Sequence, residues 1–216
     1  MTDANESTSF PQLPPPPPEF IGLIQTVVRA QGAARQSQFE VVPPAPGATV
    51  MLGDSITEGG LWSEWFPELA IVNRGIAGDT VAGVRGRLAS AIRSPRLVNV
   101  LLGTNDIAPL GGVGDVDTVA AEFESLLAEI AELAPSARVV VNSVMPRSPE
   151  LAPTLTALNA RYRAATEAVG AEYLDLWPTL AGADDELRRE FTPDGIHLTG
   201  VGYRAWARAL RPVLVG

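Results

Sequence analysis

The strongest constraint on the fold is a regular alternation of two kinds of segment after residue 47. Short apolar runs rich in β-branched side chains alternate with longer stretches in which apolar residues recur at helical spacing. The short runs are ATVMLG, AIVNR, LVNVLL, RVVVNSV and AEYLDL, which begin near residues 48, 70, 97, 138 and 171. The helical stretches span about 79 to 93, 116 to 133, 152 to 169 and 200 to 214. This alternation predicts an α/β protein whose parallel sheet is covered by helices on both faces.

The segment before this region has a different composition. Residues 1 to 19 are polar and then proline-rich, which predicts a disordered tail because such a segment buries little apolar surface. Within residues 20 to 46, apolar residues fall near helical spacing from 20 to 38 and the segment VVPPAPG follows, which predicts an appended helix and a linker. This helix either packs on the body of its own chain, contributes to a homo-oligomer or lies at the rim of a site. Residues 47 to 216 form the predicted main domain.

The side chains that the sequence lacks exclude several kinds of chemistry. There is no cysteine, and all sixteen basic residues are arginine. These absences exclude a thiol nucleophile, a lysine Schiff base and the lysine of a phosphate-binding P-loop. A formal net charge of −9, with no block of arginine, argues against nucleic acid as a partner. The N-terminus lacks the pattern of a secretory signal and no run is long enough to span a membrane, so we expect a cytoplasmic protein.

Polar residues follow three of the predicted strands. The first strand leads into GDSIT, which contains Ser55, the second into NRGIAGDT, which contains Gly78, and the third into GTND, which contains Asn105. In an open parallel sheet the carboxyl ends of the strands meet at one edge, and ligands bind there. We therefore expect these three segments to surround one crevice.

Each of these residues has a structural interpretation beside the catalytic one. Ser55 could cap the helix after the first strand, or it could point its hydroxyl outward as a nucleophile. Gly78 could serve only a tight turn before Asp79 caps the next helix, or its N–H could face the crevice. Asn105 could satisfy backbone groups of its own loop, or its side-chain amide could stabilise a developing oxyanion.

A fourth polar segment, DGIHLTGVGY, contains His197, the one histidine of the chain. Asp194 lies just before it in a Pro-Asp-Gly turn, so that its carboxylate could reach one ring nitrogen while the other nitrogen points elsewhere. A lone histidine is often structural, and zinc sites seldom use only one. The neighbouring polar segments favour a catalytic base. Gly200, Gly202 and Ala205 fit a dinucleotide-binding pattern, but no strand follows them, so they are predicted to open the last helix.

The segments GDSIT, NRGIAGDT, GTND and DGIHLTGVGY together resemble the four sequence blocks of the SGNH (GDSL-type) hydrolase family. The resemblance runs in the same order over roughly residues 47 to 215. The segments GDSITEG, NRGIAGDT and LLGTND are especially similar to the sequences of the branch that contains the catalytic subunits of platelet-activating-factor acetylhydrolase Ib. The tail and the first helix lie outside the resemblance.

The resemblance implies a fold and a set of roles. The fold would be a three-layer α/β/α arrangement around a flavodoxin-like parallel sheet of five strands. Ser55 would be the nucleophile, His197 the general base and acid, and Asp194 the group that orients the imidazole. The oxyanion hole would comprise the backbone N–H groups of Ser55 and Gly78 and the side-chain amide of Asn105. The family needs no metal and no cofactor, so we expect neither.

The expected activity is that of a serine esterase that forms an acyl-enzyme from a small-molecule ester with a short, acetyl-like acyl group. An α/β-hydrolase fold is rejected because GDSITEG lacks the G-x-S-x-G elbow. A carbohydrate O-acetylesterase, a lysophospholipase or an acyltransferase would use the same residues, and a non-catalytic binding module could retain the fold. Trp62, Trp65 and Phe66, with the loops after Asn105 and after the fourth strand, either line the substrate pocket or pack in the core.

Overall fold

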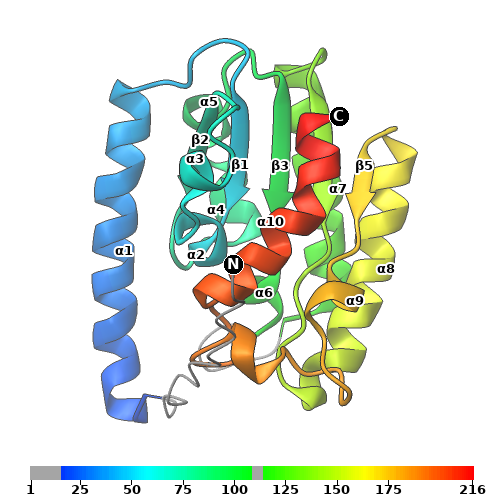
Figure 1. Ribbon diagram of the computed structural model, residues 1–216. Coiled ribbons are helices and arrows are strands. Elements are labelled where there is room, and N and C mark those ends of the chain that lie inside the picture. Colours follow the sequence, from blue (N-terminus) through cyan, green and yellow to red (C-terminus); the bar gives the residue numbers. More distant parts are fainter. Residues whose placement is uncertain (1–15, 109–113) are drawn as a thin grey trace, which may run out of the picture.

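A computed structural model of the chain describes residues 16–108 and 114–216, and it is built around one parallel sheet (Figure 1). The sheet order is β2-β1-β3-β4-β5, and all neighbouring strands run parallel. The strands are β1 (Thr49–Gly53), β2 (Ile71–Gly75), β3 (Leu97–Leu101), β4 (Arg138–Asn142) and β5 (Glu172–Leu174). All five predicted strands are therefore confirmed, and so is the α/β class.

Helices cover both faces of the sheet and give the molecule three layers. One face carries α4 (Val81–Arg85), α5 (Leu88–Ala91), α7 (Val116–Leu133) and α8 (Ala152–Ala168). The other face carries α2 (Ser55–Glu58), α3 (Trp62–Trp65), α9 (Trp177–Leu180) and α10 (Gly200–Val215). The short α6 (Thr104–Ile107) follows β3, and two turns of 3-10 helix lie at Pro149–Leu151 and Arg189–Phe191. The predicted three-layer arrangement is thus confirmed.

The alternation of side chains along each strand produces two cores. In β1, Val50 and Leu52 pack against α4, α5 and α7, whereas Met51 packs with Ile56 and α10 on the opposite face. Each of the three is fully buried. Because both faces are covered, successive side chains of a strand are apolar rather than alternately apolar and polar. This explains why the strands appear in the sequence as continuous apolar runs.

The structure differs from the predicted helix over residues 79 to 93, which is divided into α4 and α5. Gly86 ends α4, and Arg87 follows it with a backbone φ of −124° and ψ of 11°. Arg87 turns its guanidinium into the protein, where the side chain is 1% exposed and donates to the carbonyls of Gly53 and Arg74. A continuous helix would not present these donors in the same way, so the break has a cause in the buried arginine.

The predicted appended helix is α1 (Pro18–Val41), which extends beyond residues 20 to 38 at both ends. It lies at the side of the sheet next to β2 and α5 (Figure 1). Its last turns are held by Phe39, which is 5% exposed and lies beneath the Arg74 guanidinium. The helix therefore packs on the body of its own chain. Residues 1–15 of the predicted tail lie outside the described residues.

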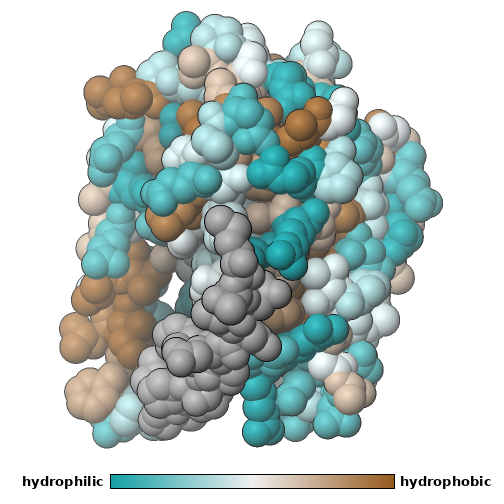
Figure 2. All heavy atoms as spheres, viewed as in Figure 1, coloured by the Kyte–Doolittle hydropathy of each residue, from teal (hydrophilic) through white to brown (hydrophobic). Residues whose placement is uncertain are grey.

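The beginning of α1 has an apolar outer surface. Phe20, Leu23 and Val27 are among its exposed side chains, and Figure 2 shows hydrophobic surface over this helix at the left of the view. No helix in residues 16–108 or 114–216 is both long enough and apolar enough to cross a membrane.

Candidate active site

The carboxyl ends of β1, β2 and β3 bring the first three polar segments together. Gly53, the last residue of β1, pairs with Gly75 at the end of β2 and with Leu101 at the end of β3. Ser55 begins the helix that follows β1, and Asn105 lies in the helix that follows β3. The segments GDSIT, NRGIAGDT and GTND therefore surround one edge of the sheet, as predicted.

Ser55 is not the cap of its helix. Asp54 occupies the cap position of α2, and its Oδ1 accepts a hydrogen bond from the N–H of Ile56 at 2.9 Å. Asp54 therefore caps α2, and the hydroxyl of Ser55 contacts a different residue. That partner is His197, whose Nε2 lies 3.0 Å from Ser55 Oγ.

The turn before α10 holds His197 and Asp194 together. Nδ1 of His197 lies 2.6 Å from Oδ2 of Asp194. The other carboxylate oxygen, Oδ1, accepts from the backbone N–H groups of Ile196 at 2.9 Å and His197 at 2.8 Å. Gly195 has a φ of +80°, a conformation that favours glycine and that folds the turn back on the carboxylate. Ser55 therefore contacts His197, and His197 contacts Asp194, although Ser55 and His197 are 142 residues apart in the chain.

These contacts decide the protonation state of the pair. Burial would raise the pKa of Asp194, but hydrogen bonds from the His197 ring and from two backbone N–H groups outweigh burial and hold the pKa well below its ordinary value. The same hydrogen bond, which the ring donates to Asp194, raises the pKa of His197 above 6.5, although burial acts in the opposite direction. An ionised carboxylate can only accept, so Nδ1 carries the ring proton and leaves Nε2 of the neutral imidazole as an acceptor.

The side chain of Asn105 lies against the segment that contains Gly78. Its Nδ2 donates to the backbone carbonyl of Asp79 at 2.9 Å. Gly78 has a φ of +78°, which a residue with a side chain rarely adopts. Next to Asn105, the carboxylate of Asp106 accepts from the N–H of Val81 at 3.0 Å. The structure therefore brings two of the predicted oxyanion-hole residues to neighbouring positions.

Comparison with known proteins identifies the family. The profile of the GDSL-like lipase/acylhydrolase family matches residues 51–205, which is more than half of the chain. The chain belongs to this family. Its members act as acylhydrolases, and the protein is accordingly a hydrolase that acts on esters.

The related proteins agree with this assignment. The chain is 30% identical over 182 residues to platelet-activating factor acetylhydrolase IB subunit alpha1 of Rattus norvegicus, and the match covers 77% of this chain and 74% of the rat protein. A Streptococcus pneumonia protein named after platelet activating factor has the same fold, with a TM-score of 0.82 and 21% identity over 92% of this chain and 100% of its own. An acetylxylan esterase from Geobacillus stearothermophilus has a TM-score of 0.64 and 20% identity over 79% and 95% of the two chains. The predicted SGNH hydrolase fold is therefore confirmed.

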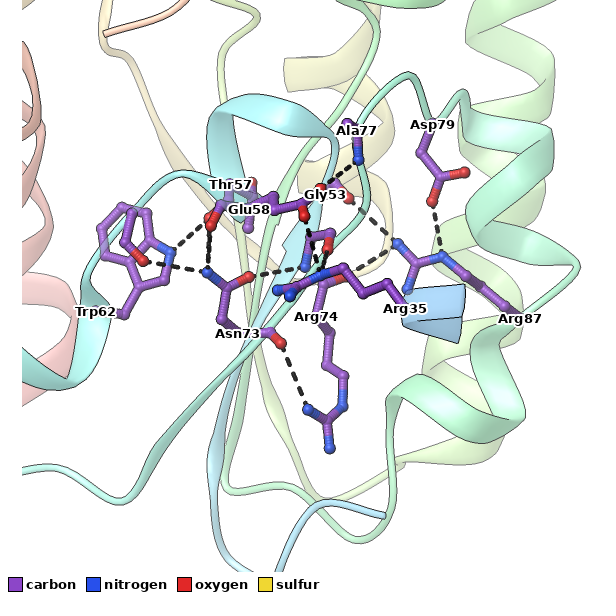
Figure 3. A network of polar contacts seen from close by, with 12 residues as sticks. Arg35, Gly53, Thr57, Glu58, Trp62, Asn73, Arg74, Ala77, Asp79 and Arg87 are labelled. Atoms are coloured by element: carbon purple, nitrogen blue, oxygen red, sulfur yellow. Dashed lines mark hydrogen bonds and ion pairs between the residues drawn. The ribbon is translucent and has the colours of Figure 1, made fainter. Parts of the chain in front are cut away.

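In this GDSL-like hydrolase the buried Arg87 forms an ion pair with the partly buried Asp79 that the sequence did not reveal. The sequence suggests Asp79 as the cap of the next helix, but Thr80 is the cap of α4, and its hydroxyl accepts from the N–H of Gly83. The carboxylate of Asp79 instead accepts from Arg87 Nε at 2.7 Å (Figure 3). Arg87 also donates to the carbonyl of Gly53, at the end of β1. The pair thereby ties the segment of Gly78 to the strand that precedes Ser55.

Two carboxyl groups beside predicted site residues have raised pKa values: Asp54, which is buried next to Ser55, and Asp106, which is partly buried next to Asn105. Burial raises the pKa of Asp54 to about 7, and burial raises the pKa of Asp106 to about 6. Oδ2 of Asp54 has no hydrogen-bond partner among the described residues. Sequence reasoning assigned Asp54 no separate role, and its position beside the predicted nucleophile was the signal that could have directed attention to it.

The aromatic residues after the nucleophile pack in the core. Trp62 is 2% exposed and Phe66 is fully buried, while Trp65 packs against the same core. Nε1 of Trp62 donates to the carbonyl of Thr57 and so supports α2 from behind. Of the two pocket-wall loops that were expected, the one after Asn105 includes residues 109–113, which lie outside the described residues.

The loop after β4 does line a pocket beside the site. This pocket has a volume of about 400 Å³ and shares Asp194 and Gly195 with the turn that carries His197. Arg147, Ser148 and Pro149 contribute its other wall. The loop after β4 therefore lines a cavity on the Asp194 side of the site, and its role as a wall of the substrate pocket stays a prediction.

Proposed function

We propose that the protein is a serine esterase that cleaves its substrate through an acyl-enzyme intermediate. The observation that carries the proposal is the chain of contacts from Ser55 Oγ to His197 Nε2, at 3.0 Å, and from His197 Nδ1 to Asp194, at 2.6 Å. A serine hydroxyl is a weak nucleophile until a base removes its proton during attack, and a neutral imidazole within hydrogen-bond reach is suited to that task.

In the proposed reaction Ser55 Oγ attacks the ester carbonyl while His197 Nε2 takes the hydroxyl proton. The imidazolium that forms is stabilised by the ionised carboxylate of Asp194. His197 then gives the proton to the alcohol as it leaves, and an ester bond now joins the acyl group to Ser55. A water molecule repeats the sequence, with His197 as its base, and releases the acid.

The proposed oxyanion hole consists of the backbone N–H groups of Ser55 and Gly78 and the side-chain amide of Asn105. The N–H of Ser55 lies in the first turn of α2, where backbone donors have no partner within the helix. Asn105 Nδ2 donates to the carbonyl of Asp79, the residue after Gly78, which supports the proposal that the amide and the Gly78 N–H lie on the same side of the site. Donors held in place before the reaction stabilise the charge that develops on the carbonyl oxygen.

The proposed substrate is an ester of a short acyl group such as acetate. Support comes from the rat relative, whose name specifies an acetylhydrolase. An enzyme that transfers the acyl group to an alcohol would share every step up to the acyl-enzyme. A competing alcohol in the assay distinguishes the two, because transfer yields a new ester whereas hydrolysis yields the free acid.

The test is a series of p-nitrophenyl esters from acetate to palmitate, measured with the wild type, Ser55→Ala and Ser125→Ala. Ser125 lies exposed on α7, where its hydroxyl donates to the carbonyl of Ala121 in the same helix, so its loss controls for the removal of a serine. We expect kcat to fall by roughly 10⁴ or more in Ser55→Ala and to stay unchanged in Ser125→Ala. Unchanged hydrolysis by Ser55→Ala would remove the proposed mechanism, and a rate that peaks at long acyl chains would remove the proposed substrate class.

A further inference from the structure

One face of α1 runs along the segment that carries the proposed oxyanion donor Gly78. Val28, Gly32 and Arg35 are at helical spacing, and each meets a different residue of the segment 75–78. α1 begins at Pro18, whereas the family profile begins at residue 51, so this contact joins a helix outside the family match to the site.

The first two of these contacts depend on glycine. A Cβ atom at Gly78 would lie 2.9 Å from Cγ1 of Val28, and a Cβ atom at Gly32 would lie 3.0 Å from Cγ2 of Ile76. The Val28 side chain therefore packs directly on the backbone of Gly78, and the Ile76 side chain packs directly on the backbone of Gly32, with no room for a further side chain at either glycine. The helix therefore limits movement of the Gly78 turn away from the sheet.

The third contact is polar and also involves the helix that begins with Ser55. Arg35 Nε donates to the carbonyl of Gly75 at 2.6 Å and lies 3.4 Å from Oε1 of Glu58 in α2. The second carboxylate oxygen of Glu58 accepts from the N–H of Ala77 at 2.6 Å. Figure 3 shows Arg35, Glu58 and Ala77 together at the end of the sheet. Glu58 thus connects the helix of Ser55 directly to the residue before Gly78.

The backbone at the end of β2 also packs closely against the backbone of α2, which strengthens the connection between the helix of Ser55 and the segment 75–78. A Cβ atom at Gly75 would lie 2.2 Å from the backbone nitrogen of Glu58 and 2.8 Å from the carbonyl oxygen of Asp54. No side chain larger than hydrogen fits between α2 and the end of β2. A shift of the segment 75–78 would therefore also displace the turn that carries Ser55.

From these contacts we infer that α1 is part of the catalytic apparatus, because Val28, Gly32 and Arg35, together with Glu58, hold the Gly78 N–H at its working distance from Ser55. These are positioning residues, since they act through Gly78 and do not touch the substrate. The inference rests on the proposed esterase function. An oxyanion donor is effective only when it is aimed at the position that the developing charge will occupy, and a misplacement of about 1 Å can cost a factor on the order of 10² in rate.

The first test is a matched pair of substitutions in the same helix. Gly32→Leu inserts a side chain against Ile76, whereas Gly22→Leu makes the same change where no atom lies within 4 Å of the new Cβ. We expect kcat for p-nitrophenyl acetate to fall about 10-fold to 100-fold in Gly32→Leu, with KM little changed, and to remain at the wild-type value in Gly22→Leu. Equal kcat values in the two variants would overturn the inference.

The second test removes the polar contact without inserting bulk. Arg35→Met deletes the hydrogen bond to Gly75 and the ion pair with Glu58 but keeps an unbranched stem next to Phe39, and Arg35→Lys keeps a donor and a positive charge. We expect kcat to fall in Arg35→Met and to recover in part in Arg35→Lys. Arg138→Met is the control, because it breaks an exposed ion pair with Glu172 at the other end of the sheet.

A readout specific to the oxyanion hole separates positioning from stability. A trifluoromethyl ketone forms a tetrahedral adduct with Ser55 whose oxygen occupies the hole, so its inhibition constant should rise by the factor by which kcat/KM falls. A lower melting temperature with an unchanged inhibition constant would mean that α1 only stabilises the fold, and the inference would be wrong. Failure of the proposed function is a separate outcome: the wild type would then hydrolyse none of the esters.

Discussion

The amide of Asn105 has two N–H donors, and the carbonyl of Asp79 accepts one of them. The second has no acceptor among the described residues, so it is available for the developing oxyanion. Removal of one such donor typically costs about 2.7 to 4 kcal/mol of transition-state stabilisation. We therefore expect Asn105→Ala to lower kcat by roughly 10² to 10³ while KM changes little. Steady-state kinetics with p-nitrophenyl acetate checks this, and a change confined to KM would assign Asn105 to substrate binding instead.

His197 gives the reaction a defined pH dependence. Only the neutral imidazole can accept the proton of Ser55, so kcat/KM should rise as the pH passes the pKa of His197. Its hydrogen bond to Asp194 raises that pKa above 6.5, and the midpoint of the rising limb should therefore lie above 6.5 in the wild type. Asp194→Asn removes the carboxylate, so the midpoint should shift to lower pH and kcat should fall by a factor on the order of 10⁴. A midpoint that did not move in Asp194→Asn would show that another group controls the limb.

At the level of elements, the sequence predicts the long helices and strands well because each buries a regular stripe. The helices α7, α8 and α10 match the predicted stretches of 116 to 133, 152 to 169 and 200 to 214. The break between α4 and α5 could not be predicted in this way. Val81, Val84, Leu88 and Ala91 all lie in the same core, so the apolar spacing continues across the break. The cause is polar: Arg87 turns inward to the carbonyls at the ends of β1 and β2, and apolar spacing carries no information about that contact.

At the level of the whole molecule, the location of the candidate site follows from the strand order. Parallel strands end at one edge, so polar segments after β1, β2 and β3 must meet there, and the sequence predicts the meeting of Ser55 with the Gly78 and Asn105 segments. The supports behind the site could not be predicted, because Arg35 and Glu58 reach Gly75 and Ala77 across separate elements. In the sequence, Arg35 and Glu58 look like ordinary charged residues on the exposed faces of two separate helices. Only the packing of α1 beside β2 brings them to the segment that carries Gly78.

The stability of the whole protein should depend on the buried carboxyl group of Asp54. Its pKa is raised from 3.8 to about 7 by burial, so between these values the folded protein holds a proton that the unfolded chain has released. The unfolded state then binds fewer protons, and the free energy of unfolding falls as the pH rises through this range. For one group the slope is at most about 1.4 kcal/mol per pH unit.

Asp54→Asn isolates this contribution, because the asparagine side chain keeps an oxygen that can accept from the N–H of Ile56 but does not titrate. Urea unfolding of the two proteins across the range from 3.8 to about 7 should show a free energy that declines more steeply with pH in the wild type than in Asp54→Asn. The difference in unfolding free energy between the wild type and Asp54→Asn should level off above about pH 7, where Asp54 is ionised in both the folded and the unfolded protein. Parallel curves would mean that Asp54 is already ionised in the folded protein at low pH, and that its burial does not contribute to the pH dependence of stability.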